Sequence, residues 1–407
     1  MTAVAMLSLH TSPLAQPGEG DSGGMNVYVR ELAASLAQAG VPTSVYVRSW
    51  RDGLPARVAV EPLFEVVHVP VGPYSLAKEH LPAVVDEFAD WVRDDVERRG
   101  DTTVLHANYW LSAVAAHRLK HDLELPLVTT FHTLAQVKSS AGDSEPDARA
   151  LAEAAVIGCS DAICASNSVE GDQLVDLYGA AGDRIEIVPP GVDRAFFSPG
   201  DRRGARRALG LGNGPVLLFV GRIQPLKGLD VAVEALARLR RSDAVLVAVG
   251  GPSGPDGQAE FERVQKLVAE LGVTDRVRFV PPQPHHMLST YYRAADLCLV
   301  PSRSESFGLV AAEALACGTP VVATAVGGLT TLVDDGVSGL LLPSRDPGVW
   351  AEAVDSLIGH PLRLAEMSVA AAHRSRHYTW STTAARLRRV YADLSSARVP
   401  AECGAHT

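Results

Sequence analysis

Short apolar runs alternate along the chain with longer segments whose apolar residues recur every three or four positions, as on one face of a helix. Such alternation of strands and helices predicts parallel sheets with right-handed crossovers. In the first half the predicted strands are residues 4–9, 43–47, 66–69, 104–106, 127–131, 162–165 and 185–188. The alternation resumes at Pro215 and continues to about Arg376, so we predict two α/β domains.

Turn residues mark the domain boundary. Pro189-Pro190-Gly191 and Pro199-Gly200 interrupt the pattern, and we predict a first domain at residues 1–198 and a second at 199–377. A last helix is expected at residues 378–396. Residues 397–407 are expected to form a disordered tail.

Composition excludes several classes of protein. A length of 407 residues, 47% hydrophobic, suffices for two domain cores. The net charge of −10 argues against nonspecific binding of nucleic acid, which depends on cationic neutralisation of phosphates. The chain has neither a long uncharged apolar run nor a charged leader with a cleavage motif, so we expect a cytoplasmic protein without a membrane span.

The cysteines and histidines give no metal signature. Five scattered cysteines include no C-x-x-C pair, so we expect neither a disulfide framework nor a metal site. His285-His286 is interpreted as part of a loop, because adjacent residues do not share a face of an element.

Glu305 and Glu313 form the most informative motif. An apolar strand ends at Pro301, Gly308 is a cap residue, and residues 309–316 predict a helix, so one acid precedes the helix and the other lies inside it. The free N–H groups of a helix start can bind phosphate, and carboxylates accept hydrogen bonds from sugar hydroxyls. The pair therefore favours a sugar nucleotide as ligand, against the alternative of two solvated surface acids.

Two further loops support a phosphate-binding function. Arg222 and Lys227 lie between an apolar strand and a helix beginning near Leu229, where ligands bind in open parallel sheets. Near the amino terminus, Gly23-Gly24 opens a helix and allows close approach of a ligand. This is not the spaced G-x-G-x-x-G of dinucleotide enzymes, so an oxidoreductase is not supported.

Taken in order, residues 221–228, 249–254, 305–313, 318–328 and 335–341 resemble the retaining, nucleotide-sugar-dependent glycosyltransferases of the family 4 type. The resemblance implies the GT-B fold: two Rossmann-like domains with parallel sheets facing a central cleft, and a C-terminal helix that crosses back to the first domain. It also implies a hexosyl or N-acetylhexosaminyl transferase that uses a nucleotide sugar as co-substrate and requires no cofactor or metal.

The first half is most similar to the inositol-phosphate glycosyltransferases that open mycothiol biosynthesis in actinobacteria. The similarity lies in residues 72–82, 106–112, 132–138 and 145–149, and overall it runs from Met6 to about Leu394. It implies transfer of N-acetylglucosamine from UDP-N-acetylglucosamine to 1L-myo-inositol 1-phosphate, which is D-inositol 3-phosphate.

The same resemblance assigns the site residues. Catalysis is expected from His132, Arg222, Lys227 and Glu305. Donor binding is expected from Gly24, Arg222, Lys227, Glu305, Ser306, Phe307, Gly308, Leu309, Val310 and Glu313. Acceptor binding is expected from Asn26, Lys78, Tyr109, Thr133 and Arg149, whose two cations and two hydroxyls suit a phosphate monoester.

Some positions depart from the family pattern. The family often has His-Ser-His where this chain has His106-Ala107-Asn108, and Tyr-Asn where it has Arg303-Ser304. A natural-product glycosyltransferase with another nucleotide sugar, GDP-linked sugars included, and a polyol, aminocyclitol or thiol acceptor therefore remains the alternative. An epimerase, a phosphorylase or a noncatalytic sugar-nucleotide binder is less well supported. The sequence leaves the base, the sugar, the acceptor and the oligomeric state open, a homodimer included.

Overall fold

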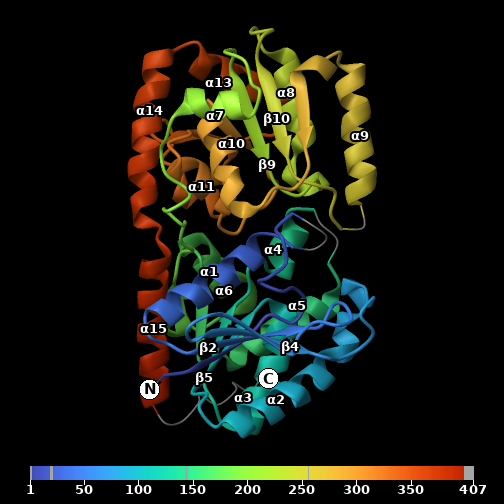
Figure 1. Cartoon of the computed structure of the whole chain (residues 1–407), viewed down its shortest axis with the longest axis vertical. Coiled ribbons are helices and arrows are strands. Elements are labelled where there is room, and N and C mark those ends of the chain that lie inside the picture. The colour runs from blue at the N-terminus through green and yellow to red at the C-terminus, as the bar shows by residue number, and fades with distance from the viewer. Residues whose placement is uncertain (1, 19–21, 143–144, 255, 398–407) are drawn as a thin grey trace. The chain divides into compact units, whose positions relative to one another are not determined.

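The computed structural model describes residues 2–18, 22–142, 145–254 and 256–397, and it separates into two units (Figure 1). One unit holds the chain up to Ala15, Met25–Gly191 and the chain from Trp380. The other holds Gln16–Gly24 and Val192–Thr379. The tail predicted at residues 397–407 lies, apart from residue 397, outside the described residues.

The sheet of the first unit has the strand order β3-β4-β2-β1-β5-β6-β7-β8. Its strands are β1 (Val4–Leu7), β2 (Thr43–Arg48), β3 (Arg57–Glu61), β4 (Phe64–Val69), β5 (Val104–Asn108), β6 (Leu127–Thr130), β7 (Ala162–Ala165) and β8 (Ile185–Ile187). All predicted strands are present and parallel. The sequence missed β3, which pairs antiparallel with β4 at the sheet edge and has no buried residue, so no buried apolar run signals it.

Alternate residues of these strands face two helical layers. Leu7 and Leu105 pack with α2 (Val85–Arg99), α3 (Trp110–Leu123) and α5 (Asp147–Cys159). Their neighbours Met6 and Val104 face the other way and pack with α1 (Gly24–Gln38) and α15 (Trp380–Ser396). Period-two alternation with both faces apolar is what a parallel sheet covered on both sides requires. The final helix thus belongs to the core of the first unit, as the family resemblance implied.

The second unit repeats this plan with a fully parallel sheet in the order β11-β10-β9-β12-β13-β14. Its strands are β9 (Val216–Val220), β10 (Val245–Val249), β11 (Val277–Val280), β12 (Leu297–Val300), β13 (Val321–Thr324) and β14 (Gly339–Leu342). Leu217 and Phe219 pack with α8 (Leu229–Arg238), α9 (Gly257–Glu270) and α13 (Pro347–Ile358). Val216 and Leu218 pack with α10 (Leu288–Ala294) and α11 (Leu309–Ala316).

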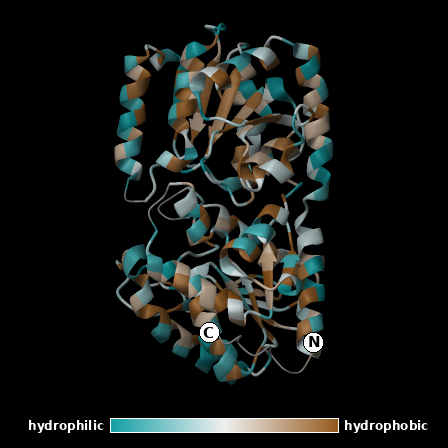
Figure 2. Ribbon diagram, turned by 180° about the vertical axis from the view of Figure 1, so that it is seen from behind, coloured by the Kyte–Doolittle hydropathy of each residue, from teal (hydrophilic) through white to brown (hydrophobic). Residues whose placement is uncertain are grey.

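The remaining helices complete the two layers. They are α4 (Ala135–Ser140), α6 (Ser168–Tyr178), α7 (Arg202–Ala208), α12 (Leu329–Leu332) and α14 (Pro361–Arg374). Figure 2 shows apolar strands inside each unit and helices that are polar on one side and apolar on the other. Within the described residues, none of the helices combines the length and the apolar character that crossing a bilayer demands.

Candidate functional site

The carboxyl ends of β5 and β6 carry two residues with unusual backbone conformations. Tyr109 follows β5 with φ 75°, and His132 follows β6 with φ 64°. A left-handed conformation at a non-glycine residue costs on the order of 1–3 kcal/mol and is held only when the surroundings enforce it. Here Tyr109 N donates to Thr130 O at 2.9 Å, which ties the two strand ends together. Both residues lie at the carboxyl edge of the sheet, where open parallel sheets bind ligands.

Four of the five residues expected to bind the acceptor gather at this edge. Lys78, from the 3₁₀ turn Lys78–Val84, has Nζ 5.3 Å from the centre of the Tyr109 ring. Arg149, on α5, has its guanidinium carbon 5.0 Å from the same ring. Arg149 Nη2 also donates to the Thr133 carbonyl oxygen at 2.9 Å and to Thr133 Oγ1 at 3.1 Å. Segments far apart in sequence thus bring two cations and two hydroxyls to one place, which we call the cradle (Lys78, Tyr109, Thr133 and Arg149).

Two glutamates that the sequence analysis did not single out also contact Arg149. Arg149 Nε donates to Glu153 Oε1 at 2.8 Å, and Nη1 donates to Glu145 Oε2 at 2.8 Å. The side chains of Arg149 and Glu153 are 3% and 0% exposed. Burial alone would raise the pKa of Glu145, but hydrogen bonds and charge from Lys138 and Arg149 outweigh it and hold the pKa below its usual value. Much of the Arg149 charge is therefore already balanced.

His132 lies beside the cradle as a neutral ring. Burial lowers its pKa to about 3. Its Nε2 lies 2.9 Å from Asn108 Oδ1, and Tyr28 contacts the ring edge-on with centroids 4.7 Å apart. Asn26, the fifth residue expected to bind the acceptor, is buried, and its Nδ2 donates to Ser12 O at 2.6 Å.

In the second unit the predicted catalytic lysine and glutamate form an ion pair. Lys227 Nζ lies 2.7 Å from Glu305 Oε2, and both side chains are about one fifth exposed, at 22% and 20%. Ser302 Oγ donates to the same carboxylate oxygen at 3.2 Å. Arg222 Nη1 contacts Ser253 Oγ at 3.4 Å. The loops after β9 and β12 thus place both cations and the first glutamate of the motif at the carboxyl edge of this sheet.

The glycine loop that precedes α1 lies against the same group. A Cβ atom added at Gly23 would lie 3.3 Å from Arg222 Nε, and one added at Gly24 would lie 3.3 Å from Leu309 Cδ1. A larger residue at either position would crowd the neighbouring side chain, which explains on steric grounds why both residues are glycine.

The helix α11 begins as the sequence predicted. Gly308 caps it with φ 98°, and a Cβ there would lie 2.7 Å from Leu329. The first amides of a helix, here those of Leu309 and Val310, have no partner within the helix and can bind an anion. Ser306 is half-buried before the cap, and Phe307 is buried with its ring 5.6 Å from that of Tyr378. The buried Phe307 therefore fixes the segment 306–310, which is expected to bind the donor, to the core of the second unit.

Glu313 is buried inside α11, and both of its carboxylate oxygens are engaged. His285 Nε2 lies 2.6 Å from Oε1, and the Tyr292 hydroxyl donates to Oε2 at 2.8 Å. The sequence predicts His285 only as a loop residue. No sequence signal joins it to a glutamate 28 positions away, because the fold alone creates the contact.

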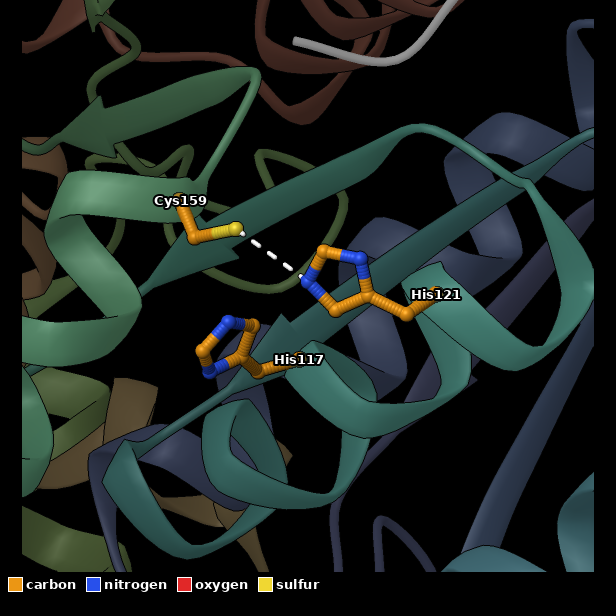
Figure 3. Close-up of side chains that lie close together, drawn as sticks. All are labelled: His117, His121 and Cys159. Atoms are coloured by element: carbon orange, nitrogen blue, oxygen red, sulfur yellow. Dashed lines mark hydrogen bonds between the residues drawn. The ribbon is translucent and has the colours of Figure 1, made fainter. Parts of the chain in front are cut away.

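A cluster of His117, His121 and Cys159 lies in the first unit (Figure 3). The two histidines are one turn apart on α3, and His121 Nε2 lies 3.4 Å from Cys159 Sγ at the end of α5. Cys159 is disulfide-bonded, whereas Cys164, Cys298 and Cys317 are free. The sequence predicted no disulfide framework, and it gave no signal for this bond. A disulfide sulfur is not the thiolate that metals prefer, so we assign no metal to this cluster.

Comparisons with known proteins agree with this geometry. Residues 22–196 match the family described as Glycosyltransferase Family 4, and residues 201–374 match Glycosyl transferases group 1. D-inositol 3-phosphate glycosyltransferase 2 of Catenulispora acidiphila is 46% identical over 95% of this chain and 94% of its own length. D-inositol 3-phosphate glycosyltransferase of Acidothermus cellulolyticus is 47% identical over 97% of this chain and 91% of its own.

Solved structures show the same architecture. Sucrose-phosphate synthase from Thermosynechococcus elongatus superposes with a TM-score of 0.92 at 31% identity, covering 98% of this chain and 100% of that one. HepE from Anabaena, solved in complex with UDP-glucose, superposes with a TM-score of 0.77 at 20% identity, covering 97% and 100%. At that identity the second likeness concerns the fold alone.

Proposed function

The chain belongs to the family of the D-inositol 3-phosphate glycosyltransferases, and on that premise we propose that it moves N-acetylglucosamine, with retention, from UDP-N-acetylglucosamine to 1L-myo-inositol 1-phosphate. This is the step that opens mycothiol biosynthesis in the family it resembles. Glycosyl transfer is the activity of the family; the donor, the acceptor and the stereochemistry are the proposal.

The cradle is the observation that carries the choice of acceptor. Lys78 and Arg149 lie over one tyrosine ring, and Arg149 is bonded to Thr133. A phosphate monoester would exchange water for two cations and two hydroxyl donors, and hydrogen bonds to charged groups each contribute about 1.5–3 kcal/mol. The cyclitol ring would then lie beside Tyr109, near the strand ends that carry His132.

On the donor side, the diphosphate would lie among Arg222, Lys227 and the first amides of α11. These groups are already in place and can stabilise charge that develops as the diphosphate leaves. Glu305, held by Lys227, would accept hydrogen bonds from the donor sugar. Glu313 would accept hydrogen bonds from the ribose.

The reaction proposed from these roles needs no protein nucleophile. The acceptor oxygen forms a bond to the anomeric carbon on the face from which the diphosphate oxygen departs. The hydroxyl proton passes to an oxygen of the leaving diphosphate, so charge and atoms balance. His132, neutral at its low pKa, would contact the sugar without taking the proton.

Arg149 supplies the observation that favours the alternative. Its pairing with Glu145 and Glu153 leaves the cradle less positive than two free cations would make it. A neutral polyol or aminocyclitol acceptor, as in a natural-product glycosyltransferase, would tolerate this balance better than a dianion.

One experiment separates the two. The purified protein is incubated with UDP-N-acetylglucosamine, UDP-glucose or GDP-mannose and with inositol 1-phosphate, free inositol or an aminocyclitol, and product masses are measured. The proposal expects a product from UDP-N-acetylglucosamine and inositol 1-phosphate, with little from free inositol. Equal turnover of free inositol would favour the alternative.

A further inference from the structure

Glu313 is held from two sides inside the second unit. Its side chain is 6% exposed, Oε1 lies 2.6 Å from His285 Nε2, and Oε2 accepts from the Tyr292 hydroxyl at 2.8 Å. A carboxylate only accepts hydrogen bonds, so His285 must carry its proton on Nε2 in this contact.

Both partners are themselves fixed. His285 opens the turn His285–Met287, and Tyr292 lies on α10 with no exposed surface. The Phe197 ring contacts both, with centroids 5.0 Å from His285 and 6.0 Å from Tyr292. Thr319 Oγ1 donates to the Tyr292 carbonyl oxygen at 2.6 Å. The two donors therefore reach Glu313 from a packed, apolar support.

Within the described residues, this arrangement leaves a lone-pair direction on each carboxylate oxygen for a ligand. A carboxylate offers about four such sites, and His285 and Tyr292 take one on each oxygen. The two that remain can accept two neighbouring hydroxyls, as the vicinal 2′- and 3′-hydroxyls of a ribose present them. A free carboxylate would have to lose rotational freedom on binding, whereas this one is already oriented.

We propose that His285, with Tyr292, is a positioning residue that orients the Glu313 carboxylate for the ribose diol of the donor nucleotide. This inference rests on the proposed function, because it takes the ligand of Glu313 to be a ribose. The two adjacent histidines therefore have different roles. His285 orients Glu313, whereas His286 is exposed, packs on Phe196 and does not act on the site.

The test measures recognition of one hydroxyl rather than affinity alone. Calorimetry gives the dissociation constants of UDP and 2′-deoxy-UDP, and of GDP and 2′-deoxy-GDP, for the wild-type chain. The variants are His285→Leu, His285→Gln and the matched control His286→Leu. Thermal unfolding is followed in parallel to confirm that each variant is folded.

The wild type should bind the ribonucleotide about tenfold more tightly than its deoxy form, the worth of one good hydrogen bond to a charged group. His285→Leu should reduce that ratio to about twofold or less. His285→Gln, whose amide can donate from nearly the same place, should restore most of it, and His286→Leu should leave it unchanged.

The possible outcomes separate a failure of the positioning role of His285 from a failure of the proposed function. A ribose ratio unchanged in folded His285→Leu would overturn the positioning role while leaving the proposed function intact. An equal loss in His286→Leu would overturn it as well, since a general disturbance of the loop would then be the cause. Failure of the wild type to bind either nucleotide would overturn both.

Discussion

Replacing Arg149 should separate its structural role from its role in the cradle. In Arg149→Met, Glu153 would lose its cation while its side chain remains 0% exposed. Removing one partner of a buried pair costs about 3–5 kcal/mol, because the other charge stays desolvated. Lys78 offers the matched control: it is half-buried, and its recorded contact among the described residues is the Tyr109 ring. Lys78→Met should cost about 1 kcal/mol or less.

The assay combines stability with acceptor preference. Urea denaturation gives the free energy of unfolding of each variant, and kcat/KM is measured for inositol 1-phosphate and for free inositol. Each variant should lose roughly ten- to a hundredfold of the preference for the phosphorylated acceptor, from one lost charge-assisted hydrogen bond of about 1.5–3 kcal/mol. Only Arg149→Met should also lose several kcal/mol of stability. Adding Glu153→Gln to it should recover part of that loss, because the unpaired charge is gone while the amide oxygen can still accept from Ala135 N and the Tyr178 hydroxyl.

Two results would refute this reasoning. If Arg149→Met unfolds at the same urea concentration as the wild type, the buried pair does not hold the structure as its geometry implies. If Lys78→Met keeps the full preference for the phosphorylated acceptor, Lys78 does not contact the phosphate.

Further predictions concern the donor site and the response to acid. Glu313→Gln should weaken nucleotide binding by about 1–3 kcal/mol, measured by calorimetry, since an amide accepts fewer hydrogen bonds; unchanged binding would place Glu313 outside the site. Lys227→Met should lower kcat about a hundredfold with a smaller change in KM, because its charge acts most on the departing diphosphate; a change confined to KM would contradict this. Burial and the nearby His132 lower the pKa of His106 to about 3, so the unfolded chain binds a proton first as the pH falls below about 6.5. His106 therefore lowers the free energy of unfolding only below about pH 6.5. Between that pH and about pH 3, the free energy of unfolding falls by up to about 1.4 kcal/mol per pH unit. Urea titrations between pH 7 and 4 should show that the free energy of unfolding falls less steeply with pH in His106→Asn than in the wild type. Equal slopes in the two proteins would disprove this role of His106.

The sequence was sufficient where local chemistry decides structure. Gly308 and the apolar segment after it predicted α11, from Leu309 to Ala316, and hence the different settings of Glu305 and Glu313. The strand before Arg222 and the helix from Leu229 could also be predicted from the sequence, because apolar periodicity and glycine caps act over a few residues.

Contacts between segments that are distant in the sequence could not be predicted in the same way. Glu153 faces Arg149 one turn away on α5, a spacing that any surface helix also shows, so only its complete burial distinguishes it. His285 and Glu313 meet because β12 returns the chain to α11 beside α10. The antiparallel edge strand β3 escaped notice because none of its residues is buried and its pairing depends on β4.

The left-handed backbone at Tyr109 and His132 has a consequence for protein engineering. Glycine would adopt both conformations with less strain, but it would also remove the ring that contacts Lys78 and Arg149 or the imidazole beside Tyr28. The Tyr109 ring is part of the hydrophobic core, and loss of a buried aromatic side chain costs about 3–5 kcal/mol, more than the strain relieved. A library selected for heat resistance alone should therefore keep Tyr109 and enrich glycine at the half-buried His132, which yields stable proteins with little transferase activity. Selection that alternates heat challenge with turnover should keep the tyrosine and the histidine and find its gains elsewhere.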